Sequence, residues 1–133
     1  MTENNPAPSL IGSAMNDGKH IFVFGSNLAG RHGKGAAKCA RADWGAVTGI
    51  GVGRTGMAYA IPTKGHTLRR LPLPIIRPYV LQFIDYAQKH EEFIYLLTRI
   101  GCGLAGYEDW QIATMFLTAP TNVVIPKKWE ECW

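Results

Sequence analysis

HIFVFGSNLAGRHGKGAAKCARADW, residues 20–44, predicts a buried strand, a glycine-rich loop and a helix in immediate succession. Residues 21–24 form a continuous apolar run, which is typical of a strand buried on both faces of a parallel sheet. Glycines follow at positions 25, 30, 33 and 35. Because glycine lacks a Cβ, it lets the backbone turn sharply and lets a ligand approach closely. Residues 34–42 are mostly good helix formers and predict the helix.

The loop in this stretch is a candidate phosphate site. Free N–H groups at a helix N-terminus, together with the helix dipole, attract an anion. We therefore expect a phosphate-binding loop between the strand and the helix. The alternative is a tight turn that holds no ligand, since glycine loops are common between regular elements.

A second stretch repeats the local order of the first. Residues 93–97 predict another apolar strand, residues 98–106 (TRIGCGLAG) a glycine loop, and residues 107–117 a helix with Trp110, Ala113 and Leu117 on one side. Open α/β sheets bind ligands at the carboxyl ends of their parallel strands. We therefore expect the two loops to lie side by side, where they could hold a diphosphate.

The rest of the chain predicts a single α/β domain over residues 19–133, after a flexible arm of residues 1–18. The glycines of residues 51–56 spell G-x-G-x-x-G, but a strand-like run at 57–61 follows them where a dinucleotide fingerprint requires a helix. We therefore expect a loop or hairpin there, with Pro62 ending the strand.

Residues 66–77 carry two prolines and three arginines and predict an exposed connection. A helix is then expected to begin at Pro78, because proline suits the first helical turn. Helical spacing marks its buried stripe as Val80, Phe83, Ile84 and Ala87. A last strand is expected at residues 122–125.

Composition narrows the class of protein. The 133 residues are 47% hydrophobic and 18% charged, as in an ordinary globular domain, and the net charge of +4 suits an anionic partner such as a nucleotide or nucleic acid. Three widely spaced cysteines argue against a disulfide framework and for a reducing compartment. Without a signal-peptide pattern or a run of membrane-spanning length, we expect a cytoplasmic protein that does not enter a membrane.

The cysteine and histidine side chains could act as nucleophiles or metal ligands, but the sequence favours structural or solvent-exposed roles for them. Cys102 lies in a glycine loop before a helix, but no histidine is near it in sequence, so we expect it to fill space in the loop. His32 is expected to be a solvated loop histidine. The four histidines show no metal-ligand spacing with one another or with the cysteines, so we expect neither a metal nor another cofactor.

Over residues 20–126 the sequence resembles the macro domain, an ADP-ribose-binding α/β module. The stretch from Ser26-Asn27-Leu28 to the glycine turn resembles the family's first ligand loop, and Gly103–Tyr107 resembles its diphosphate-wrapping loop. YAIPTK at residues 59–64 and TRIGCGL at 98–104 are similar to the terminal ADP-ribose protein glycohydrolase branch. The chain also resembles short phage and bacterial macro-like proteins of unassigned role.

The resemblance implies a shortened three-layer α/β/α fold with a mostly parallel central sheet. It also implies that Asn27 hydrogen-bonds the distal ribose and that the second loop wraps the phosphates with backbone amides. The ligand-binding residues so implied are Ser26, Asn27, Leu28, Gly33, Gly35 and Ala36 in the first loop, and Gly101, Cys102, Gly103, Leu104, Ala105, Gly106 and Tyr107 in the second.

The resemblance further implies a catalytic lysine. Lys64 falls where the glycohydrolase branch has a lysine that attacks the anomeric carbon of the opened ribose as an imine. The branch's catalytic carboxylate follows the Gly-Leu of the second loop, where this chain has Ala105, so Asp109 becomes the candidate carboxylate. Glu108 and Asp109 could instead favour the first turn of a helix. Asp17 is a candidate adenine-binding aspartate, by its proximity to the first strand.

We therefore expect a module that binds ADP-ribose or a related nucleotide, free or attached to a macromolecule, and that could hydrolyse an ADP-ribosyl bond. The alternative is a nucleic-acid or polyanion-binding module without catalysis. Three groups of cations support that alternative, namely Arg31/Lys34/Lys38/Arg41, Arg69/Arg70/Arg77 and Lys127/Lys128.

Overall fold

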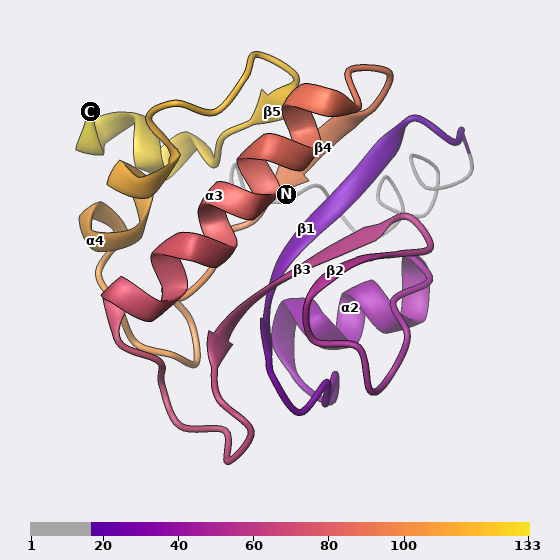
Figure 1. Ribbon diagram of the computed structural model, residues 1–133, viewed down its shortest axis with the longest axis vertical. Helices are drawn as coiled ribbons and strands as arrows, with labels where there is room; N and C mark the ends of the chain where they lie inside the picture. Colours follow the sequence, from indigo (N-terminus) through magenta and orange to yellow (C-terminus); the bar gives the residue numbers. More distant parts are fainter. Residues whose placement is uncertain (1–16) are drawn as a thin grey trace.

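A five-stranded, mostly parallel sheet forms the centre of the computed structural model, which describes residues 17–133 (Figure 1). The strand order is β2-β3-β1-β4-β5. The strands β1, β3, β4 and β5 run parallel, and β2 pairs antiparallel with β3. Their bounds are β1 His20–Asn27, β2 Gly53–Thr55, β3 Ala58–Lys64, β4 Ile94–Leu97 and β5 Val123–Val124.

The middle strand, β1, is the apolar run predicted from the sequence. Ile21, Phe22, Val23 and Phe24 are all buried, because β1 lies between β3 and β4 and is covered on both faces. Alternate residues point to opposite faces, so Ile21 and Val23 belong to one apolar cluster while Phe22 and Phe24 belong to another. The prediction of a strand buried on both faces is confirmed.

Helices cover the two faces unequally. Among the described residues, α2 (Gly35–Asp43) is the one helix on the first face, with Ala37 and Ala40 buried and Trp44 at its C-cap stacked on Phe22 at a ring distance of 5.3 Å. The other face carries α3 (Leu73–Lys89), α4 (Asp109–Ala113) and the 3₁₀ helices η1 (Thr114–Phe116) and η2 (Lys127–Cys132). Figure 1 shows α2 on one side of the strands and α3 with α4 on the other. The predicted α/β class and mostly parallel sheet are thus present.

The start of α3 differs from the prediction. The helix begins at Leu73, five residues before Pro78, so residues 73–77 are helical and not part of an exposed connection. Pro72 is the N-cap and Pro74 lies in the first turn, where a missing N–H costs nothing. Pro78 lies inside the helix, and buried Ile76 and Val80 hold the turns on either side of it. The predicted buried stripe of Val80, Phe83, Ile84 and Ala87 is confirmed.

Pro62 does not end β3, as the sequence suggested, because the strand continues to Lys64. It lies beyond the part of β3 that β2 covers, and it pairs with Ser26 beside a register shift in β1. An irregular ladder at that point tolerates the missing N–H. The predicted hairpin before it is confirmed as β2 and β3.

The C-terminal elements are shorter than predicted. The helix expected over residues 107–117 is split into α4 and η1, and the last strand is limited to Val123–Val124. Trp110 and Leu117 are exposed, while Ile112 and Phe116 are buried against the sheet.

Candidate functional site

The two glycine loops leave the sheet next to each other, because β1 and β4 are neighbouring parallel strands. Both the N–H and the hydroxyl of Thr98 donate to the Val23 carbonyl, at 3.1 and 2.8 Å. A Cβ added to Gly25 would lie 3.4 Å from the Ile100 side chain. The prediction that the loops lie side by side is confirmed.

The chain topology opens a crevice at this point. From β1 the chain passes through α2 to β3 on one side, and it returns through α3 to β4 on the other. The loop after β1 therefore leads to one face of the sheet and the loop after β4 to the other. Such a switch in strand order creates a crevice at the carboxyl ends of the strands, where open α/β sheets bind ligands.

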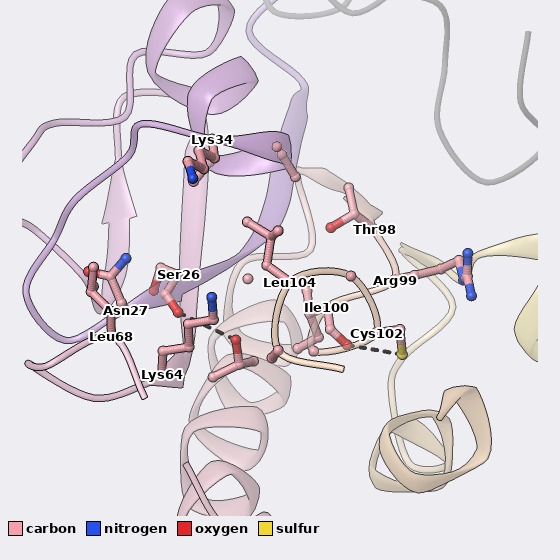
Figure 2. A pocket seen from close by; sticks show the side chains of 18 of the residues that line it. Ser26, Asn27, Lys34, Lys64, Leu68, Thr98, Arg99, Ile100, Cys102 and Leu104 are labelled. Atoms are coloured by element: carbon pink, nitrogen blue, oxygen red, sulfur yellow. Dashed lines mark hydrogen bonds between the residues drawn. The ribbon is translucent and has the colours of Figure 1, made fainter. Parts of the chain in front are cut away.

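A cavity of about 760 Å³ occupies this crevice. Its volume falls within the range of about 300–1,000 Å³ that is usual for small-molecule sites. The lining residues come from both loops, from the end of β3 and from the start of α2 (Figure 2): Gly25, Ser26, Asn27, Arg31, Gly33, Lys34, Gly35, Ala36, Ala37, Thr63, Lys64, Leu68, Thr98, Arg99, Ile100, Gly101, Cys102, Gly103, Leu104 and Ala105.

The cavity brings together most of the residues that the sequence singled out. Its lining includes Ser26, Asn27, Gly33, Gly35, Ala36, Lys64, Gly101, Cys102, Gly103, Leu104 and Ala105. It does not include Leu28, Gly106, Tyr107 or Asp109. Asp17 lies before the start of β1, at the end of that strand opposite the cavity, where its carboxylate accepts from the Lys19 N–H at 2.8 Å.

The first loop is closed by its own side chains. The Asn27 amide oxygen accepts from the Arg31 N–H, and the Asn27 amide nitrogen donates to the Arg31 carbonyl, both at 2.9 Å. The Ser26 hydroxyl donates to the Gly51 carbonyl. Gly51 has to be glycine, since an added Cβ would lie 2.0 Å from the Asn27 carbonyl oxygen. These bonds fix the loop around the cavity.

His32 corrects the sequence interpretation, because it is buried with only 2% of its surface exposed. Its Nε2 lies 3.2 and 3.0 Å from the carbonyl oxygens of Val47 and Ile50. The ring also packs edge-on against Phe24. His32 therefore ties the first loop to the loop before β2.

The N-terminus of α2 faces the cavity without a cap. The N-cap residue, Lys34, makes no capping hydrogen bond with its side chain, and the first helical turn contains no acidic residue. Gly35, Ala36 and Ala37 of that turn line the cavity. An uncapped helix N-terminus presents free N–H groups and a positive partial charge, which suit an anion.

The charged side chains in the cavity wall are all cations. Arg31, Lys34, Lys64 and Arg99 contribute to the lining, and no aspartate or glutamate among residues 17–133 does. The Lys64 amine points into the cavity (Figure 2) and forms no ion pair with any residue among 17–133. Arg99 instead points away from Lys64 in Figure 2.

Asp109 is held by two donors outside the cavity. The Arg99 guanidinium donates to both carboxylate oxygens at 2.8 Å, and the Trp129 indole N–H donates to one of them at 2.7 Å. The bonds from Arg99, helped by the one from Trp129, lower the pKa of Asp109 to about 2. Asp109 is therefore charged at neutral pH, and its hydrogen bonds connect Arg99 to the C-terminal segment.

Cys102 lies in the cavity wall as a half-buried thiol that donates to the Ile100 carbonyl at 3.4 Å. Burial, assisted by the nearby Asp109 carboxylate, raises its pKa to about 12. Because only the thiolate is nucleophilic, this environment fits the space-filling role expected from the sequence.

The loop after β3 adds a wall that sequence reasoning missed. Leu68 lines the cavity with φ +67°, a conformation that leucine rarely adopts. Next to it, the Arg70 guanidinium lies 4.3 Å from the centre of the Tyr107 ring, and the Tyr107 hydroxyl donates to the Leu71 carbonyl. We call this contact between residues 65–71 and the second loop the Arg70–Tyr107 latch. No local pattern marks it, since its partners are far apart in sequence.

Comparisons of the chain with protein-family models, curated proteins and solved structures found no match. Among residues 17–133, no group of three or more histidine, cysteine or acidic residues is arranged to hold a metal ion. In the same part of the chain, every helix is too short or too polar to cross a bilayer.

Proposed function

We propose that the protein is a macro-like domain that binds ADP-ribose or a closely related nucleotide in the cavity between its two glycine loops. The observation that carries the proposal is the cavity itself, which lies at the switch in strand order with cations and an uncapped helix N-terminus in its wall. These features suit a phosphorylated ligand. The sequence resemblance to the macro domain supplies the choice of ADP-ribose among such ligands.

The cavity wall offers partners for the phosphates of such a ligand and for a base or ribose. A diphosphate would bind between the free N–H groups of α2 and the backbone of Gly101–Ala105. Backbone N–H groups at a helix N-terminus or in a concave loop carry a positive partial charge that attracts phosphate oxygens. The apolar side chains of Leu68 and Leu104, which are 38% and 69% exposed, offer surfaces for a base or ribose.

A thermal-shift panel tests the proposal. ADP-ribose, its phosphorylated and cyclic relatives, NAD and nucleoside monophosphates are compared at equal concentration. A ligand that binds only the native state raises the melting temperature, and at 100 times its Kd it adds about 2.7 kcal/mol of stability. We expect ADP-ribose or a near relative to give the largest shift. Equal shifts from all anions, or none, would contradict the proposal.

Hydrolysis of an ADP-ribosyl bond is a second candidate function, favoured by the position of Lys64. Its amine lies in the cavity without an ion-pair partner among residues 17–133. The neutral amine could attack the anomeric carbon to give a glycosylamine, while the group attached there leaves with the bonding electron pair. Opening of the ribose ring would convert the glycosylamine into an imine, and water would then hydrolyse the imine to free ADP-ribose and the regenerated lysine. The part of the cavity wall that residues 17–133 form has no carboxylate to act as acid or base, so within this part of the chain the activity would depend on Lys64.

Conversion of Lys64 to Ala tests this second function. Turnover of an ADP-ribosylated peptide should be abolished, while ADP-ribose should still bind. Borohydride should trap an adduct with the unaltered protein and not with the variant. Turnover that survives in Lys64→Ala would rule out the lysine mechanism and leave a ligand-activated water as the nucleophile.

A further inference from the structure

One side of α2 carries a row of cations that the cavity alone does not explain. Between β1 and β2, residues 28–52 contain Arg31, Lys34, Lys38 and Arg41 but a single carboxylate, Asp43. All four cations are exposed. Lys34, Lys38 and Arg41 follow the i, i+4, i+7 spacing that places residues on one side of a helix. We call these four residues the α2 cation row.

The row begins at the mouth of the cavity. Arg31 and Lys34 contribute to the cavity lining, whereas Lys38 and Arg41 lie further along α2 and do not. At 1.5 Å per residue, the helical part of the row is about 11 Å long. A ligand bound in the cavity could therefore continue along α2 if it carried further negative charges.

Carboxylates of the described chain do not neutralise the row. Among residues 17–133, none of its four members takes part in an ion pair. The nearby Asp43 accepts a hydrogen bond from the Cys39 thiol at 3.6 Å. Most other carboxylates lie in or beside the helices of the opposite layer: Asp85, Glu91, Glu92, Glu108, Asp109, Glu130 and Glu131. The α2 layer is therefore the positive side of the domain.

From this geometry we propose that the α2 cation row binds the phosphate backbone of a single nucleic-acid strand whose terminal nucleotide enters the cavity. This inference rests on the proposed nucleotide-binding function. Lysine and arginine that neutralise successive phosphates give affinity without reading sequence. A single strand fits because its terminal base is neither paired nor locked in a duplex stack, so it can enter the cavity at little cost.

Fluorescence anisotropy with a labelled single strand of about ten nucleotides tests the inference, with DNA and RNA as separate arms. Neutralising three or four phosphates predicts a slope of about −2 to −3 in a plot of log K against log salt. The double variant Lys38→Gln/Arg41→Gln should reduce that slope by about 1.4, since each single-strand phosphate contact contributes about 0.7. Free ADP-ribose should compete with the strand in the unaltered protein.

The matched control is Arg69→Gln/Arg77→Gln, which removes the same charge from exposed positions outside the row and outside the cavity lining. It should leave the slope unchanged. Equal losses in both double variants would mean general attraction to a basic protein, and this would overturn the inference, as would absence of strand binding or lack of competition by ADP-ribose.

Calorimetry with free ADP-ribose separates this inference from the function on which it rests. Lys38→Gln/Arg41→Gln should bind ADP-ribose as the unaltered protein does, because neither residue lines the cavity. If ADP-ribose binds but the strand does not, the inference fails and the proposed function stands. If ADP-ribose does not bind at all, the proposed function itself fails.

Discussion

Gly103 is the position in the second loop where a side chain can be added with least disturbance to the fold. An added Cβ meets no atom within 4 Å, and the backbone there is not in the left-handed region. Gly35 is a poorer choice, since its φ of +58° would strain any other residue. A bulky residue at position 103 therefore probes the cavity more cleanly than one at position 35.

Gly103→Val should weaken ADP-ribose binding at least about tenfold, or about 1.4 kcal/mol, because the branched side chain would enter the space that the phosphates need. The melting temperature should stay within about 2 °C of the unaltered protein, since exposed positions tolerate substitution. Calorimetry and a thermal melt measure the two effects. Gly103→Ala should give a smaller loss, and unchanged affinity in Gly103→Val would place the ligand elsewhere.

The contribution of Asp109 to the stability of the fold should depend on pH. Its pKa of about 2 in the folded protein is below the ordinary value of 3.8, so its bonds to Arg99 and Trp129 stabilise the fold above pH 4. This contribution is lost as the pH falls towards 2. Asp109→Asn should therefore cost about 1–2 kcal/mol at pH 7 and little at pH 2, measured by urea unfolding at a series of pH values.

Glu91→Gln is the control for this measurement, because Glu91 is an exposed carboxylate whose loss should change stability by less than about 0.5 kcal/mol. If Asp109→Asn loses turnover of an ADP-ribosylated substrate but matches the unaltered protein in stability at every pH, Asp109 takes part in catalysis and its role as an anchor is wrong.

Among single residues, the sequence predicted correctly those cavity residues that lie near the end of a parallel strand. Most glycines of the two loops and Lys64 line the cavity, because they lie near the carboxyl ends of parallel strands. His32 and Leu68 were not predictable in the same way. The burial of His32 depends on the distant carbonyls of Val47 and Ile50, and the cavity position of Leu68 depends on a left-handed turn that no local pattern marks.

Among the elements, the Arg70–Tyr107 latch connects two walls of the cavity that are far apart in sequence. The Tyr107 hydroxyl bonds to Leu71, and Arg70 lies over the Tyr107 ring while its Nη1 approaches the Ala105 carbonyl at 3.5 Å. Leu71 in turn is bonded through its N–H to Thr63 of β3 at 2.9 Å. The second loop is thus connected to the strand that carries Lys64.

Tyr107→Phe removes the hydrogen bond of the latch but keeps the ring under Arg70. It should lower the free energy of unfolding by about 1 kcal/mol, because the Leu71 carbonyl loses its donor. Amide hydrogen exchange should become faster in residues 101–107 and 65–71. Tyr79→Phe on α3 is a matched control and should leave exchange in both segments unchanged. Equal exchange in the two variants would show that the latch does not hold the loop.

The elements show where sequence patterns fail. Apolar periodicity predicted the buried stripe of α3, but the prolines led to errors at its start and at the end of β3. Proline restricts the backbone without by itself ending an element. Pro74 is tolerated because it lies in a first turn, and Pro62 because the ladder beside it is already irregular. Only the tertiary structure determines whether a given proline ends a helix or strand or is tolerated within it.

For the whole molecule, the order of the strands matters more than any single residue. The two strand-loop-helix units were predictable from local pattern, and parallel pairing alone places their loops at one edge of a sheet. The sequence could not give the position of β1 between β3 and β4, which comes from pairings between segments distant in the chain. Because of that arrangement, the loop from β1 to α2 and the loop from β4 to α4 lead to opposite faces of the sheet, and the cavity lies between them.

The most direct test of the central claim is a ¹H–¹⁵N NMR titration with ADP-ribose, which reports where on the molecule the ligand binds. We expect saturable shifts in the amides of Gly33–Ala37 and Gly101–Ala105, the two walls of the cavity. Amides at the opposite end of β1, near His20, should not move. Absence of saturable shifts, or shifts concentrated away from these two loops, would contradict the claim that the loops form a nucleotide site.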